Sequence, residues 1–400
     1  MMRQRTRIPV LGAVLLAAGL LLASACGGET ADTLTVDGEE EGADPQAAAT
    51  AEMAAEIQRL KQVSGTDALE FYRAGMGLIQ LMEIEAGIEK LEAGRELAPE
   101  NVAFYNALAM AYPMARREDE GLAALETSVR LAPADTTAVT GLARRYLELR
   151  RLDDCQALLE EAVADHPDAA DLHAVMGSLR LRQGDEPGAR AEYTRALELE
   201  PENADALFST GVLARRHGDL EEAATRWKEA LAANPDHLGA LMGLGGLALE
   251  GGRDDEASLL FLQALSLDPH LFAARRSLGN ALILEGLYDE AVELFRAGVK
   301  LQPNNLDAHF YLGKAYLQRG FIEDAEQEFE YVARTDPQNQ QAYLELVRIY
   351  ALRNEVPRAY NAMRQLLNLG FRDTDRLLDD QDFKTLVSYA PARELLESVN

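Results

Sequence analysis

The sequence predicts an all-α solenoid built from stacked helical hairpins. Three periodic observations predict this fold: a proline, a pair of small residues and one bulky residue each recur every 34 residues over about three quarters of the chain. The prolines are Pro99, Pro133, Pro167, Pro201, Pro235, Pro269, Pro303 and Pro337. A period of this length fits one helix–turn–helix, which buries its apolar face only by stacking on its neighbours.

Placing the proline at position 32 divides residues 68–373 into nine repeats. They span residues 68–101, 102–135, 136–169, 170–203, 204–237, 238–271, 272–305, 306–339 and 340–373. Position 8 is Gly or Ala in repeats 1 to 8, and position 20 is Gly, Ala or Cys throughout. Position 24 is bulky in every repeat. Small residues allow the two helices of a repeat to approach closely, and the bulky residue fills the layer beside them.

The helix ends are also marked in the sequence. Glycine at position 15 of repeats 4 to 8 predicts a left-handed residue that ends the first helix, and the proline stops the second helix. Repeats 1 to 3 have Met82, Arg116 and Arg150 at position 15, so we expect their joints to differ from those downstream. In repeat 2, Pro113 predicts that the first helix ends near Tyr112.

These marker positions resemble those of the tetratricopeptide repeat family, and the resemblance covers residues 68–373. It implies a right-handed superhelical solenoid whose first helices line a concave, protein-binding face. Repeat 9 departs from the pattern, with Val347 at the small position and Phe371 at the proline position. Residues 374–400 resemble the C-terminal cap that closes many bacterial arrays.

Residues 1–25 predict a lipoprotein signal peptide. Three arginines precede an apolar stretch, residues 10–22, that is too short for a standard membrane span. Residues 23–26 resemble a bacterial lipobox in which Cys26 is lipidated. The alternative is a secreted soluble protein, because the three residues before Cys26 are also an ordinary cleavage site. With Gly27 after the cysteine, the pattern resembles that of outer-membrane lipoproteins facing the periplasm of the bacterial cell envelope.

Two segments connect the signal peptide to the repeats. Residues 26–50 hold seven acidic residues and neither a basic nor an aromatic one, which predicts an acidic disordered tether. Residues 51–67 place Met53, Ile57 and Leu60 at helical spacing, which predicts an N-terminal capping helix over the first repeat.

Charge and motifs exclude several classes of function. The chain has 39 basic and 67 acidic residues, a formal charge of −28, and such a surface repels the phosphates of nucleic acids. The six histidines lack metal-ligand spacing; His173 and His309 occupy position 4, which predicts packing roles. Cys155 fills the small position 20. We therefore expect no enzyme, no metal and no cofactor; an enzyme with an unrecognised site is the alternative.

The family resemblance implies that positions 2, 5, 9, 12 and 13 of the first helices face a ligand. From repeat 3 onward these positions hold seven basic and five acidic residues, in a chain that is acidic as a whole. The predicted partner-binding residues are Arg144, Arg182, Phe208, Arg215, Arg216, Met242, Arg276, Asn280, Phe310, Lys314 and Arg348. This face suits a peptide with acidic residues or a free carboxylate terminus. The alternative is that the arginines pair with neighbouring acids and only neutralise the face.

One more specific resemblance is incomplete. Arg276 and Asn280 resemble part of the clamp with which eukaryotic chaperone adaptors of the family hold a C-terminal carboxylate. The following repeats have Tyr311, Gln341 and Glu345 where that clamp requires Asn, Lys and Arg. A full clamp is therefore not predicted.

The functional hypothesis is a non-catalytic, lipid-anchored periplasmic adaptor for assembly of an envelope complex. The layout is similar to that of outer-membrane lipoproteins that serve pilus secretin assembly, barrel insertion or exopolysaccharide export, although function on a common fold transfers poorly. The membrane is contacted through the lipid anchor only. A recruiter of peptidoglycan enzymes is the alternative.

Overall fold

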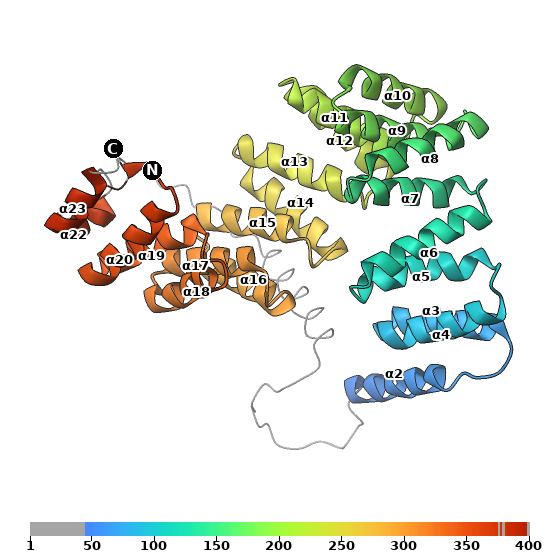
Figure 1. Cartoon of the computed structure of the whole chain (residues 1–400), viewed down its shortest axis with the longest axis horizontal. Helices are drawn as coiled ribbons and strands as arrows, with labels where there is room; N and C mark the ends of the chain where they lie inside the picture. Colours follow the sequence, from blue (N-terminus) through green and yellow to red (C-terminus); the bar gives the residue numbers. More distant parts are fainter. Residues whose placement is uncertain (1–44, 375–376, 378–380, 398–400) are drawn as a thin grey trace. The chain divides into compact units, whose positions relative to one another are not determined.

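The computed structural model describes residues 45–374, 377 and 381–397, and the regular elements in this part of the chain are helices. Helices that follow one another within residues 45–199 and within residues 220–368 pack against each other, as Figure 1 shows, which confirms the predicted all-α solenoid. The predicted signal peptide, Cys26 and residues 26–44 of the predicted tether lie outside the described residues.

Each repeat forms one pair of helices. The first helices are α3 (Ala68–Gln80), α5 (Val102–Met114), α7 (Thr136–Glu148), α9 (Ala170–Arg182), α11 (Ala204–Arg216), α13 (Leu238–Glu250), α15 (Phe272–Leu284), α17 (Leu306–Arg319) and α19 (Gln340–Leu352). The second helices are α4 (Ile84–Leu97), α6 (Glu118–Leu131), α8 (Leu152–Asp165), α10 (Glu186–Leu199), α12 (Leu220–Ala233), α14 (Asp254–Leu267), α16 (Tyr288–Leu301), α18 (Ile322–Thr335) and α20 (Val356–Asn368). Each first helix begins at the first residue of its repeat.

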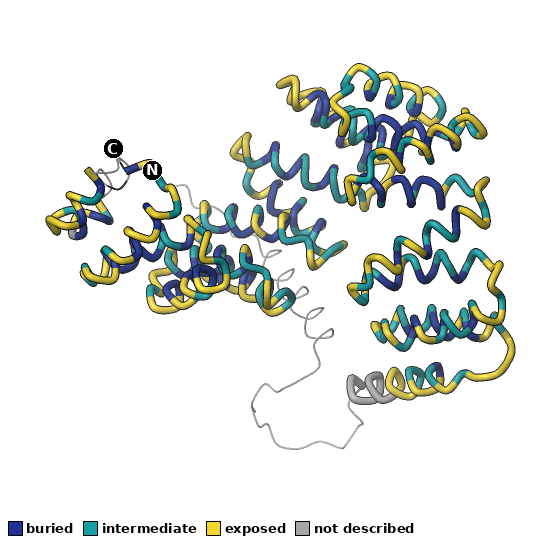
Figure 2. Tube along the Cα trace, viewed as in Figure 1, coloured by how far each residue is buried: buried dark blue, intermediate teal, exposed yellow. Residues whose placement is uncertain are grey.

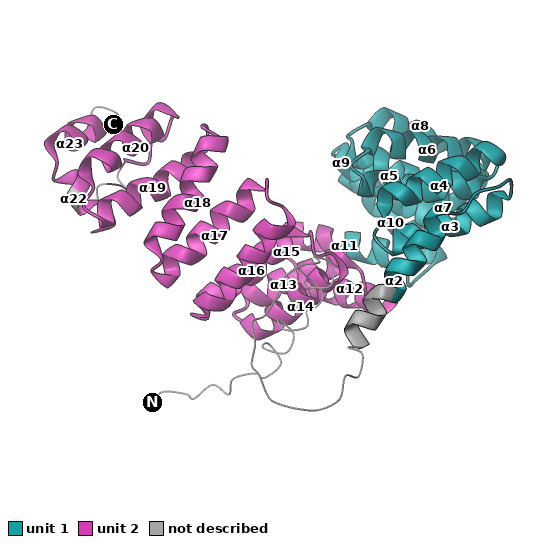
Figure 3. Ribbon diagram, turned by 90° about the horizontal axis from the view of Figure 1, so that it is seen from below, with its two compact units in different colours: residues 1–210 teal, residues 211–400 magenta. Residues whose placement is uncertain are grey.

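The chain divides into two compact units, residues 1–210 and residues 211–400, coloured separately in Figure 3. Consecutive helices pack against one another from α2 to α10 in unit 1 and from α12 to α20 in unit 2. First helices also contact the first helix of the following repeat, as α7 contacts α9 in unit 1 and α15 contacts α17 in unit 2. First helices of neighbouring repeats therefore lie side by side within a unit.

The core lies between the two helices of each repeat, where Figure 2 shows buried residues on the facing sides. The bulky residue at position 24 rests on the small residue at position 8. A β-carbon at Gly279 would come within 2.2 Å of the Phe295 ring, and one at Gly245 within 2.6 Å of the Phe261 ring. Both rings are fully buried. Glycine at these positions is therefore required by the ring that covers it.

The helix joints of repeats 1 to 3 do not differ in backbone geometry from those downstream, contrary to expectation. Met82, Arg116 and Arg150 have φ of 62°, 60° and 57°, the left-handed region that the glycines downstream adopt at 66° to 87°. In all nine repeats the N–H at position 16 donates to the carbonyl at position 11 over 2.8–3.0 Å. This bond closes the joint whichever residue stands at position 15.

Helix α5 ends at Met114, two residues after Tyr112, near which Pro113 predicts its end. A proline in the last helical turn removes only one backbone hydrogen bond, and its ring needs space on the neighbouring helix. Gly121 of α6 provides that space: a β-carbon there would come 2.9 Å from Cδ of Pro113. The small residue at position 20 therefore accommodates the proline.

Two sets of polar contacts fix the repeats in place. At position 34 a side-chain oxygen accepts a hydrogen bond from the start of the next first helix. These caps are Asp67, Asn101, Asp135, Asn203, Asn305 and Asn339. Consecutive repeats are also joined by the Tyr146 hydroxyl, which donates to Glu126 over 2.9 Å while Arg151 lies 4.5 Å over the ring. Tyr112, Glu92 and Arg117 repeat this arrangement.

Additional helices cover both ends of the array. Helix α2 (Pro45–Lys61) contacts α3, and its Leu60 packs against Leu78. This helix begins six residues before the predicted capping helix, so the end of the predicted tether is helical. At the other end, η1 (Gln381–Phe383) and α22 (Lys384–Val387) contact α19, and α23 (Ala390–Glu397) contacts α22.

Candidate protein-binding site

The two histidines at position 4 have structural contacts on both ring nitrogens. His173 places Nδ1 2.8 Å from Glu192 and Nε2 3.1 Å from the Pro167 carbonyl. His309 places Nδ1 2.6 Å from Glu328 and Nε2 2.9 Å from the Pro303 carbonyl. Each ring thereby connects a first helix to its own second helix and to the proline of the preceding repeat.

Cys155 is fully buried between α7 and α8, and its Sγ lies 3.4 Å from the Ala143 carbonyl. Burial raises the pKa of this thiol to about 11, so the reactive thiolate is disfavoured at neutral pH. Among the described residues, no group of three or more His, Cys, Asp and Glu is arranged to hold a metal ion. In residues 45–374 and 381–397, no helix combines the length and apolar character that crossing a membrane requires.

Three of the predicted partner-binding arginines are paired with carboxylates. Arg144 on α7 forms an ion pair with Asp205, two repeats further on. Arg215 on α11 forms one with Glu250 on α13. Arg348 on α19 lies 2.6 Å from Glu345 and 3.2 Å from Asp382. For these three arginines, the local-neutralisation alternative describes the contacts that the structure contains.

Three other predicted cations contact no carboxylate within the described part of the chain: Arg182 on α9, Arg276 on α15 and Lys314 on α17. Arg182 and Arg276 are exposed and Lys314 is half-buried. In unit 2, Arg276 and Lys314 share one aromatic neighbour. The Arg276 Cζ lies 6.0 Å, and the Lys314 Nζ 5.5 Å, from the centre of the Tyr311 ring.

Tyr311 is part of an aromatic cluster formed by repeats 7 and 8. Its ring lies 5.7 Å from that of Phe295 at an interplanar angle of 25°, and 6.0 Å from that of Phe272. Phe310 was predicted to face a partner, but it is only 8% exposed and packs edge-on against Tyr311 and Phe329. Phe310 therefore supports the cluster from within the core.

The remaining predicted residues differ in exposure. Arg216 is exposed, and Phe208, Met242 and Asn280 are half-buried. Met242 packs against the core of repeat 6. The Asn280 amide, next to Arg276 on the same helix face, forms no hydrogen bond within the described residues.

Tyr311 was missed as a site residue. In the sequence it appeared only as a departure from the carboxylate clamp. The available signal was its position on a first helix, three residues before Lys314, since side chains three residues apart share a helix face. The 34-residue spacing did not predict the contacts of Tyr311 with Phe272 and Phe295 of repeat 7.

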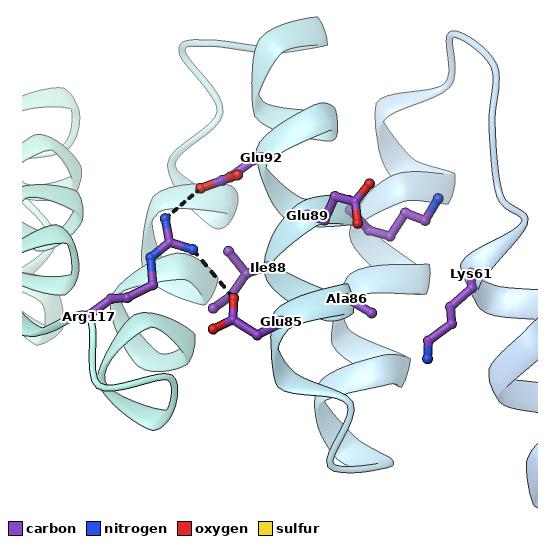
Figure 4. Close-up of a pocket in the computed structure, with 8 residues that line it drawn as sticks. Lys61, Glu85, Ala86, Ile88, Glu89, Glu92 and Arg117 are labelled. Atoms are coloured by element: carbon purple, nitrogen blue, oxygen red, sulfur yellow. Dashed lines mark hydrogen bonds and ion pairs between the residues drawn. The ribbon is translucent and has the colours of Figure 1, made fainter.

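A shallow cavity in unit 1, shown in Figure 4, carries charges that largely neutralise one another. Its lining includes Lys61, Glu85, Glu89, Lys90, Glu92 and Arg117. Arg117 lies 3.3 Å from Glu92 and 3.6 Å from Glu85, and Lys61 lies 2.8 Å from Glu83 beside the cavity. Lys90 also has a partner, since it donates to the Val63 carbonyl over 2.8 Å. Because most of its charges are paired, the cavity does not indicate a ligand site.

Comparisons with known proteins identify the repeats. Family models described as Tetratricopeptide repeat match residues 114–179, 175–227, 211–272 and 310–368, and one described as TPR repeat matches residues 279–320. Together they cover more than half of the chain. A search of curated proteins finds no significant match.

Solved structures are similar to this chain at low sequence identity. The Cut9–Hcn1 hetero-tetramer of the APC/C is 12% identical, with a TM-score of 0.52 over 88% of this chain and 81% of that one. PilF of Pseudomonas aeruginosa is 20% identical, with a TM-score of 0.45 over 52% of this chain and 94% of that one. A tetratricopeptide repeat protein of Parabacteroides merdae is 20% identical, with a TM-score of 0.42 over 65% and 97%.

Proposed function

The chain belongs to the tetratricopeptide repeat family, and on this premise we propose that it is a non-catalytic scaffold that binds an acidic segment of another protein along its first helices. One observation carries the proposal: Arg182, Arg276 and Lys314 lie on first helices without a carboxylate partner among the described residues, in a chain whose formal charge is −28. Such cations attract acidic partners and leave room for their carboxylates.

We further propose that the scaffold is held at the bacterial outer membrane by lipid on Cys26 and faces the periplasm. The acidic segment after Cys26 would separate the repeats from the membrane surface. In this position the scaffold would assist the assembly of an envelope complex for secretion, pilus formation or exopolysaccharide export. The support is the lipobox resemblance and the acidic composition of residues 27–44.

A pull-down from detergent-solubilised cells tests the scaffold. The triple variant Arg182→Glu, Arg276→Glu, Lys314→Glu should lose partners that the unchanged protein captures after crosslinking in cells. The matched control changes Lys228, Lys300 and Arg364 to glutamate; these residues are exposed on second helices and likewise contact no carboxylate within the described residues. Equal recovery of partners by both variants would show that the first helices are not the binding surface.

The anchor has its own test. Replacing Cys26 by serine should move the protein from the membrane to the soluble periplasmic fraction, because one thiol carries all of the proposed attachment. Continued sedimentation of the Cys26→Ser protein with membranes would exclude a lipid on this cysteine as the attachment.

A further inference from the structure

We propose that Arg276, Tyr311 and Lys314 form one anion-binding site, and that it takes the side-chain carboxylates of an internal acidic segment of the partner. This inference rests on the proposed function and names the residues that recognise the partner. The three residues come from two consecutive first helices, α15 and α17, which contact each other in unit 2.

The charges at this site remain available to a ligand. A cation over an aromatic ring is oriented by the ring but keeps its full charge. Arg276 and Lys314 both lie over the Tyr311 ring, so the two charges are within about 12 Å of each other. The contrast in the same unit is Arg215, whose charge is already matched by Glu250.

The aromatic cluster holds the site in place before any ligand binds. Phe295, which stacks on Tyr311, is fully buried and rests on Gly279, while Phe310 supports Tyr311 from the core. A ring held by this much packing keeps one orientation, and the cations over it lose less freedom when a ligand binds.

The surroundings favour side-chain carboxylates over a terminal one. Binding of a C-terminal carboxylate by the family's clamp requires further cations from the next repeat, but Gln341 and Glu345 occupy those positions. Glu345 is itself paired with Arg348. Two cations from two repeats instead offer two places for carboxylates. Alternate side chains of an extended segment lie on one side, roughly 6–7 Å apart, so one acidic segment can contact both cations.

Fluorescence anisotropy on the full-length chain in detergent micelles tests the site. The probe is a fluorescein-labelled peptide of six Glu-Ala pairs with an amidated C-terminus. The Arg276→Gln, Lys314→Gln variant loses the ion pairs that the exposed Arg276 and the half-buried Lys314 form with the probe. It should bind the probe about tenfold more weakly, ~1.4 kcal/mol, and with a weaker salt dependence. Lys300→Gln, a matched exposed cation on α16, should bind as the unchanged chain does.

Three results would overturn the inference: no binding of the probe to the unchanged chain, an equal loss with Lys300→Gln, or binding of a Gln-Ala peptide with a free C-terminus that depends on Arg276 and Lys314. The last result would assign the site to a terminal carboxylate. If the labelled peptide does not bind while partner recovery in the pull-down still depends on the first-helix cations, the scaffold function is supported and only the proposed anion-binding site is excluded. If the pull-down is insensitive to the first-helix variant, the proposed function itself fails.

Discussion

Replacing Arg150 by glycine should stabilise the chain. Arg150 has a left-handed backbone, φ 57°, at the joint between α7 and α8, a conformation that costs a residue with a β-carbon roughly 1–2 kcal/mol. Its side chain makes no ion pair or hydrogen bond within the described residues, so no polar contact is lost. Glycine has greater conformational freedom in the unfolded chain, and this reduces the gain by roughly 0.5–1 kcal/mol. The expected net gain is therefore about 0.5–1 kcal/mol.

The same reasoning extends to Met82 and Arg116, which occupy separate joints with the same backbone. Because distant substitutions add, the triple glycine variant should gain roughly 1.5–3 kcal/mol. Asn354, also left-handed at φ 57°, is the control that should gain least, since asparagine tolerates this region. Gly184→Ala is the reverse test. No atom lies within 4 Å of its β-carbon position, so the expected loss of about 1 kcal/mol comes from the backbone alone.

The measurement should report on unit 1, since a repeat array need not unfold in one step. Cys155 in repeat 3 is buried, and its modification by a thiol reagent along a urea series follows local unfolding. In a Cys26→Ser background it is the only cysteine. The triple variant should shift the labelling midpoint to higher urea and Gly184→Ala to lower urea. An unchanged or lower midpoint for the triple variant would refute the strain argument.

Three further outcomes are expected. Gly279→Ala should cost roughly 1–3 kcal/mol in denaturant unfolding because its β-carbon meets the Phe295 ring, whereas Gly141→Ala, with open space at its β-carbon, should gain up to about 1 kcal/mol. Native Cys155 should resist labelling at pH 8, because burial raises its pKa to about 11; rapid labelling would contradict its burial. Burial and the bond to Glu126 raise the pKa of Tyr146 from 10.0 to about 12. Folding favours the neutral form of this tyrosine, so its contribution to the free energy of unfolding should be complete below pH 10 and be lost between pH 10 and 12. In the Tyr146→Phe variant the free energy of unfolding should decrease less over this pH range.

The sequence by itself determined the repeat, its length and the sites of close helix contact. Proline at position 32 and small residues at positions 8 and 20 act within one hairpin, and they recur in the same phase along the chain. Such local requirements leave a periodic trace that can be read without coordinates. Each first helix begins where that phase places it.

The tertiary structure alone decided which of the predicted first-helix cations pair with a carboxylate among the described residues. Arg144 pairs with Asp205 and Arg215 pairs with Glu250. The two pairs join different repeat positions at different separations along the chain, so the 34-residue period does not predict them. It also decided that Arg150 takes the left-handed conformation normally given to glycine, because the closing hydrogen bond of the joint holds it there. The Tyr311 cluster likewise depends on side chains from three helices meeting at one ring. Ion pairs and aromatic stacking between repeats depend on the distances between side chains of different repeats. The 34-residue period determines only the helix packing within each repeat.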